Sequence, residues 1–138
     1  MRIPHVIVGT ALAAAVLAST GAAPAAVQPS SDAVARGKTT FLDSCAVCHG
    51  DKGRGDGPAA PALKPRPADL SRLAKQYGEF PAAHVTATLN GTATVIAHGN
   101  PGMMIWQAIF LAQDAGNQEK ADARIADVVA YIESIQRK

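Results

Sequence analysis

The sequence of 138 residues predicts one small domain built from α-helices. Three observations support this fold class. Apolar residues recur at helical spacing in several segments, most clearly near the C-terminus. No segment shows the strict alternation of apolar and polar residues that a half-buried strand requires, so nothing indicates a sheet. A stretch dense in glycine and proline, Gly50 to Pro67, divides the helical segments and predicts a long loop.

The first 25 residues have the layout of a secretory signal peptide. Arg2 precedes an uncharged run from Val6 to Ala18, and small residues follow. We expect cleavage after Ala25, which leaves residues 26–138 as the mature domain in the periplasm. The apolar run is rich in alanine and shorter than the ~20 residues of a membrane-spanning helix, so a cleaved leader is favoured over an anchor. If the leader were retained, the protein would instead be anchored to the membrane.

The first helix is expected over residues 31–45. Val34, Phe41 and Leu42 lie at near-helical spacing, and Ser30, Ser31 or Asp32 can act as the N-cap. The loop that follows, 50–67, is longer than most loops of compact domains. Loops of this length usually have a function, and wrapping a cofactor would be a sufficient one.

The second half predicts shorter helices and then a longer one. Candidates cover residues 69–78 and 82–91, each ending at a glycine. An irregular passage follows over 92–102, and apolar density returns from Met103. The segment 119–138 predicts a terminal amphipathic helix whose apolar residues follow helical periodicity: Ile125, Val128, Val129, Ile132 and Ile135.

The charge balance excludes one class of partner. The formal net charge is +2, so no overall basic character indicates nucleic-acid binding. The distribution is uneven, because residues 52–75 are mainly basic and residues 114–133 mainly acidic. These charges are either ordinary solvated side chains or two faces that steer a partner protein.

The two cysteines lie in the pattern Cys45-x-x-Cys48-His49, which is typical of c-type haem attachment. Two thiols at this spacing can bond to the two vinyl-derived carbons of a porphyrin, and the adjacent histidine can then bind the iron. A thioredoxin-like motif would need a βαβ context, and a zinc site would need further ligands at paired spacing. The pattern therefore predicts one covalent haem c on Cys45 and Cys48, with His49 as an axial ligand.

Over residues 32–138 the chain resembles the class I monohaem cytochromes c. The resemblance is carried by Gly37 and Phe41 ahead of the Cys45–His49 motif, and then by Met103-x-x-Trp106 and Val128-x-x-Tyr131. It implies the cytochrome c fold: a small orthogonal bundle of about four to five helices, with long irregular loops, around one haem. It also implies that the first and last helices cross at Gly37, with Phe41 near Val128 and Tyr131.

The sixth iron ligand is expected to be Met103. In the family this methionine commonly begins a Met-Pro-x-aromatic segment, and here Met104 stands in place of the proline. Met104 is therefore the alternative ligand, and His98 or the more distant His84 would give bis-histidine ligation. A Met/His pair raises the reduction potential of the iron.

The resemblance also suggests residues around the ligands. A proline carbonyl in the loop, from Pro58 or Pro61, would accept the second ring N–H of His49. Trp106, Tyr77 or Arg66 would hydrogen-bond the haem propionates.

These expectations favour an electron carrier rather than an enzyme. A six-coordinate iron exchanges single electrons without a substrate pocket, and a small protein suits transient docking on a dehydrogenase, an oxidase or a reductase. One alternative is a haem-bearing subunit of a periplasmic dehydrogenase or oxidase complex. A haem enzyme or ligand sensor, which needs an open axial position, is less favoured. No membrane span is expected after cleavage.

Overall fold

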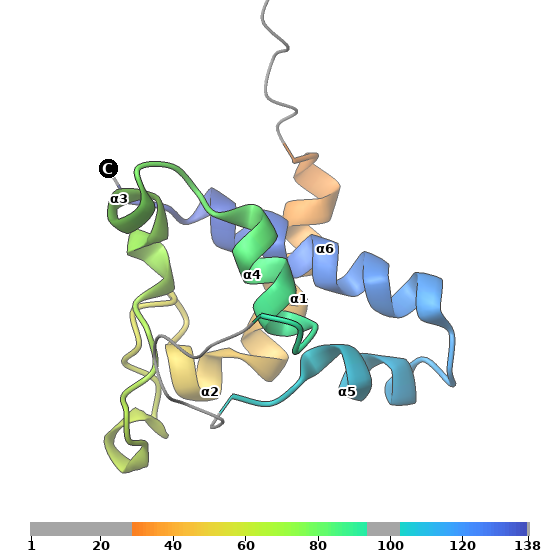
Figure 1. Cartoon of the computed structure of the whole chain (residues 1–138), viewed down its shortest axis with the longest axis horizontal. Coiled ribbons are helices and arrows are strands. Elements are labelled where there is room, and N and C mark those ends of the chain that lie inside the picture. Colours follow the sequence, from red (N-terminus) through yellow and green to blue (C-terminus); the bar gives the residue numbers. More distant parts are fainter. Residues whose placement is uncertain (1–28, 94–102, 138) are drawn as a thin grey trace, which may run out of the picture.

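The computed structural model describes residues 29–93 and 103–137, and it is all-helical over those residues (Figure 1). The elements in chain order are α1 (Ser31–Ser44), α2 (Ala46–His49), the 3₁₀ turns η1 (Ala60–Ala62) and η2 (Leu70–Arg72), α3 (Leu73–Tyr77), α4 (Ala82–Leu89), α5 (Trp106–Gln113) and α6 (Gln118–Ser134). The predicted all-α class is confirmed. The leader, His98 and most of the passage 92–102 lie outside the described residues.

Side-chain caps begin the two longest helices. The Ser30 hydroxyl accepts from the Ala33 N–H at the start of α1, and the Asn117 side chain accepts from the Lys120 N–H at the start of α6. Each cap satisfies a backbone donor that has no partner within its helix. Ser30 is one of the three caps predicted for the first helix.

Helices α1 and α6 cross in close contact at Gly37. A Cβ atom placed on Gly37 would overlap the carbonyl oxygen of Asp127, so only glycine fits there. Arg36 donates from Nε and Nη2 to the two carboxylate oxygens of Asp127, at 2.7 and 2.8 Å. Phe41 is fully buried, and its ring centroid lies 5.1 Å from that of Tyr131. The predicted crossing is therefore confirmed.

The core is centred on α6, with α4 and α5 packed beside it (Figure 1). The predicted apolar face of α6 is buried from Ile125 to Ile132, while Ile135 lies just past the helix end and is partly buried. The facing helices contribute Leu73, Val85, Leu89, Trp106 and Phe110. Each short helix is thus stabilised by the core more than by its own length.

The connecting segments agree with the predicted breaks in most places. Residues 50–67 form a loop with one short turn, η1. The single helix expected over 69–78 is instead divided into η2 and α3, and Gly78 ends it with φ 87°. Within the described residues, no helix has both the length and the apolar character to cross a membrane.

Candidate haem-attachment site

The two cysteines lie on one short turn of helix. The N–H groups of Cys48 and His49 both donate to the Cys45 carbonyl, at 3.1 and 2.9 Å. Residues three apart on such a turn face the same side, so the two sulfur atoms lie together. Both thiols are unpaired, with Cys45 buried and Cys48 half-buried. This placement would allow both thiols to form bonds to the same side of one planar group.

The raised pKa of Cys45 argues against its use as a redox nucleophile. Burial, with a smaller contribution from Cys48, raises the pKa of the Cys45 thiol to about 12. A nucleophilic redox cysteine normally has a lowered pKa, because the thiolate is the reactive form. In addition, no three or more His, Cys, Asp or Glu side chains gather into a metal site within the described ranges.

The loop after the motif holds the turn by its carbonyl groups. The N–H groups of Gly55, Gly57 and Ala59 donate to the carbonyls of His49, Cys48 and Val47, at 2.8, 3.2 and 2.9 Å. These are the carbonyls that the end of a helix leaves without partners. A Cβ atom on Gly57 would overlap the backbone of α2, so glycine is required for this close approach. The loop therefore fixes the orientation of α2.

The ring of His49 is held in one tautomer. Its Nδ1 atom lies 3.0 Å from the carbonyl oxygen of Ala68, and a carbonyl can only accept, so Nδ1 carries the hydrogen. The other ring nitrogen, Nε2, then keeps its lone pair. Burial lowers the pKa of His49 and the bond to Ala68 partly offsets this, so the neutral ring is favoured. A neutral imidazole oriented through its second nitrogen is the form that binds a metal.

The partner of His49 differs from the expected proline. Pro58 and Pro61 are both exposed in the first part of the loop, and the structure gives the place beside Nδ1 to Ala68 instead. The Gly53 carbonyl accepts from the N–H groups of Leu70 and Ser71, at 2.7 and 3.3 Å. These bonds hold the end of the loop, which contains Ala68, beside its beginning next to His49. Sequence reasoning missed Ala68 because a main-chain acceptor has no residue-type signature.

Of the residues expected on the other side of the haem, the two methionines and Trp106 lie at the start of α5, whereas His84 and Arg66 lie on other elements. Met103 and Met104 precede the helix and are 39% and 57% exposed, whereas Trp106 is buried with its ring 5.5 Å from that of Phe110. The choice of Met103 over Met104 stays a prediction. His84 is exposed on α4, with its ring 5.8 Å from that of Tyr77. Arg66 is exposed in the loop.

The donor set therefore fits a covalently bound haem. Two unpaired thiols share one turn, and the next residue presents a neutral imidazole whose Nε2 has no hydrogen-bond partner among the described residues. Exposed thioethers at Met103 and Met104 offer a second, softer ligand. No additional cofactor is needed to explain the arrangement.

Comparison with known proteins agrees with this geometry. A family model described as cytochrome c matches residues 34–136, which run from the first turn of α1 to just past the end of α6. Comparison with curated proteins and with solved structures gave no match. Because the match spans most of the chain and includes the whole Cys45–His49 turn, the chain belongs to the cytochrome c family.

Proposed function

We propose that this protein is a periplasmic electron carrier with one haem c bound through Cys45 and Cys48. The observation that carries the proposal is the bond from His49 Nδ1 to the Ala68 carbonyl, which leaves Nε2 as a lone-pair donor beside two unpaired thiols. When bound, the haem supplies a one-electron iron couple. Membership of the cytochrome c family supports a carrier rather than an enzyme.

Each residue of the site has a separate task. Cys45 and Cys48 hold the group covalently, and His49 binds the iron through Nε2. Met103, the less exposed of the two methionines, provides the sixth ligand and favours the ferrous state through its soft sulfur. A haem held by these residues would exchange electrons without a substrate bound to its iron.

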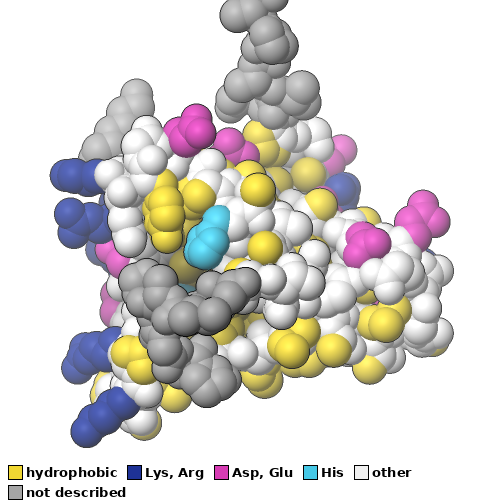
Figure 2. All heavy atoms as spheres, viewed as in Figure 1, with side chains coloured by type: hydrophobic (Ala, Val, Ile, Leu, Met, Phe, Trp, Pro, Cys, Tyr) yellow, Lys and Arg dark blue, Asp and Glu magenta, His cyan; other side chains and the backbone are white. Residues whose placement is uncertain are grey.

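The surface charges support transient docking on redox partners. Figure 2 shows Lys and Arg side chains gathered along the left-hand edge of this face, where some Asp or Glu side chains also lie, and further Asp and Glu side chains at the top and toward the right. In the sequence, residues 52–75 carry six basic side chains against the two acidic ones of Asp56 and Asp69: Lys52, Arg54, Lys64, Arg66, Arg72 and Lys75. Such asymmetry orients a small protein toward an acidic surface on a dehydrogenase, oxidase or reductase and is weakened by salt.

The proposed location rests on the first 25 residues. Their basic start, short apolar run and small residues before Pro24-Ala25 are typical of a cleaved export signal. Haem attachment to cysteines outside the cytoplasm is consistent with that location.

The proposal is tested by optical spectra of the purified protein in both oxidation states, with and without carbon monoxide. A closed six-coordinate site predicts a reversible one-electron change and ferrous spectra that carbon monoxide does not alter. The variant Met103→Ala opens a position and should bind carbon monoxide, while Met104→Ala serves as the matched control. Ready binding by the wild-type protein would instead indicate a ligand sensor or a haem enzyme.

A further inference from the structure

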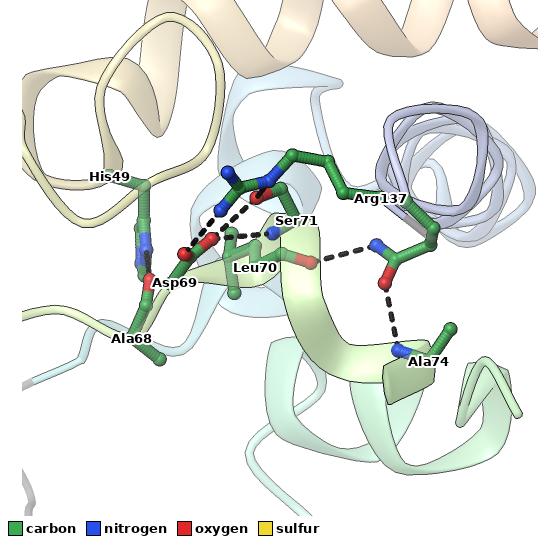
Figure 3. A network of polar contacts seen from close by, with 8 residues as sticks. His49, Ala68, Asp69, Leu70, Ser71, Ala74 and Arg137 are labelled. Atoms are coloured by element: carbon green, nitrogen blue, oxygen red, sulfur yellow. Dashed lines mark hydrogen bonds and ion pairs between the residues drawn. The ribbon is translucent and has the colours of Figure 1, made fainter. Parts of the chain in front are cut away.

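The last residues of the chain fold back onto the segment that carries Ala68. Beyond the end of α6, Arg137 donates from Nη2 to Asp69 Oδ2 and from Nε to Ser71 Oγ, both at 2.8 Å. Its backbone N–H also donates to the Ser71 carbonyl, at 2.8 Å. Arg137 therefore ties the end of α6 to η2 and to Asp69 by three bonds, and Figure 3 shows the two side-chain bonds.

Further bonds make the segment from Asp69 to Ala74 rigid. Asp69 Oδ1 accepts from the N–H and the hydroxyl of Ser71, at 3.1 and 2.6 Å. The Gln136 amide donates to the Leu70 carbonyl and accepts from the Ala74 N–H, at 2.7 and 2.8 Å. Asp69 and Ser71 are therefore hydrogen-bonded to Arg137, and Leu70 is hydrogen-bonded to Gln136.

This tie reaches His49 through one peptide unit. The Ala68 carbonyl belongs to the planar peptide that ends at the nitrogen of Asp69, so fixing the Asp69 backbone fixes the direction of that carbonyl. Figure 3 shows the sequence of contacts from Arg137 through Asp69 to Ala68 and the His49 ring. Arg137 is thus connected to the hydrogen bond on His49 through Asp69 and a single peptide unit.

We propose that Arg137 is a positioning residue for His49: through Asp69 and Ser71 it holds the Ala68 carbonyl on Nδ1 and so sets the donor strength of the imidazole. The inference rests on the proposed function of His49 as an iron ligand. A hydrogen bond from Nδ1 makes the ring a more basic ligand, and outer partners of this kind commonly change metal affinity by about 10- to 100-fold.

A purely structural role is a weaker explanation for the ion pair. The side chains of Arg137 and Asp69 are 46% and 30% exposed, and half-exposed pairs contribute little to stability. Arg36 and Asp127 form a comparable pair between α1 and α6. Because Arg36 bonds to α6 and not to the Ala68 segment, the variant Arg36→Gln serves as a control for the loss of an arginine ion pair elsewhere in the fold.

Charge and hydrogen bonding predict opposite effects on the reduction potential. Loss of a positive charge favours ferric iron and lowers the potential. Loosening the hydrogen bond on Nδ1 makes the imidazole a weaker electron donor to the iron, and this raises the reduction potential. Two variants separate these effects because they keep the net charge: Arg137→Lys loses the forked geometry of the guanidinium, and Ser71→Ala loses the hydroxyl that joins Asp69 to Arg137.

The experiment uses the haem-loaded protein and measures the midpoint potential together with the exchange rate of the His49 Nδ1 proton by NMR. In Arg137→Lys and Ser71→Ala we expect faster proton exchange and a higher potential. The expected rise is up to about 59 mV, which for one electron corresponds to a tenfold change in the ratio of the affinities of ferric and ferrous iron for the imidazole. Arg36→Gln should leave the proton exchange unchanged.

The inference is overturned if both charge-neutral variants keep the wild-type potential and exchange rate, or if Arg36→Gln speeds the exchange equally. A wild-type protein that lacks a reversible iron couple would overturn the proposed function, and this inference with it. A normal wild-type couple with unaffected variants would overturn the inference alone.

Discussion

The contact between α1 and α6 predicts a large effect from the smallest possible substitution, Gly37→Ala. The added methyl group would overlap the Asp127 carbonyl oxygen and would also approach the Cβ of Tyr131. A main-chain carbonyl in the middle of a helix cannot rotate away, so the two helices must separate. Separation would loosen the packing of Phe41 against Tyr131.

The magnitude follows from two opposing terms. Alanine in place of glycine favours a helix by about 1 kcal/mol. Overpacking a well-packed contact costs about 1–3 kcal/mol, and the rigid backbone places this site near the upper limit. The net change is a loss of about 2 kcal/mol in the free energy of unfolding, which lowers the melting temperature by roughly 10 °C for a domain of this size.

The assay is urea unfolding of the haem-loaded protein followed by far-ultraviolet circular dichroism. The matched control is Thr39→Ala in the same helix, which is exposed and gains helix propensity without entering the crossing. It should be neutral or slightly stabilising. If Gly37→Ala were as stable as the control, the close crossing described for α1 and α6 would be refuted.

Three further perturbations test other parts of the account. Met103→Ala should abolish the weak long-wavelength band of the ferric protein that reports sulfur bound to iron, while Met104→Ala keeps it; the opposite pattern would exchange the two assignments. The double variant Cys45→Ala, Cys48→Ala, made without haem, should show much reduced cooperative unfolding by circular dichroism, because residues 50–67 bury little apolar surface of their own, and a native-like melt would contradict this. Burial, with a smaller contribution from Asp51, raises the pKa of Tyr131, so its stabilising contribution is present below pH ~10 and is lost as the pH rises through the folded-state pKa. The free energy of unfolding of Tyr131→Phe should therefore fall less steeply above pH ~10 than that of the wild-type protein. An unchanged pH dependence would exclude ionisation of Tyr131 as a cause of alkaline unfolding.

The sequence predicts well those features that depend on local pattern. Helical periodicity indicated α1 and α6 with nearly their observed bounds, and the glycine-rich stretch indicated the loop. The motif Cys45–His49 indicated the turn that bears both thiols, because its spacing alone determines that they share a face. The crossing at Gly37 followed from the family resemblance together with the cost of a glycine inside a helix.

Features that depend on where the chain returns could not be predicted. The acceptor of His49 Nδ1 is a backbone carbonyl, and the sequence does not show which of some twenty carbonyls in the following loop comes back to the ring. The tie made by Arg137 joins residues 66 and 68 positions apart. The division of 69–78 into η2 and α3 also arises from tertiary contacts, because Gln136 takes both the Ala74 N–H and the Leu70 carbonyl, the pair that a continuous helix would join.

The central claim is that one haem is bonded covalently to Cys45 and Cys48. Intact-mass spectrometry of protein produced with a working haem-maturation system, followed by proteolysis, tests it most directly. We expect each chain to gain the mass of one haem, located on the peptide that contains both cysteines. A chain of unmodified mass with two alkylatable thiols at Cys45 and Cys48 would contradict the account.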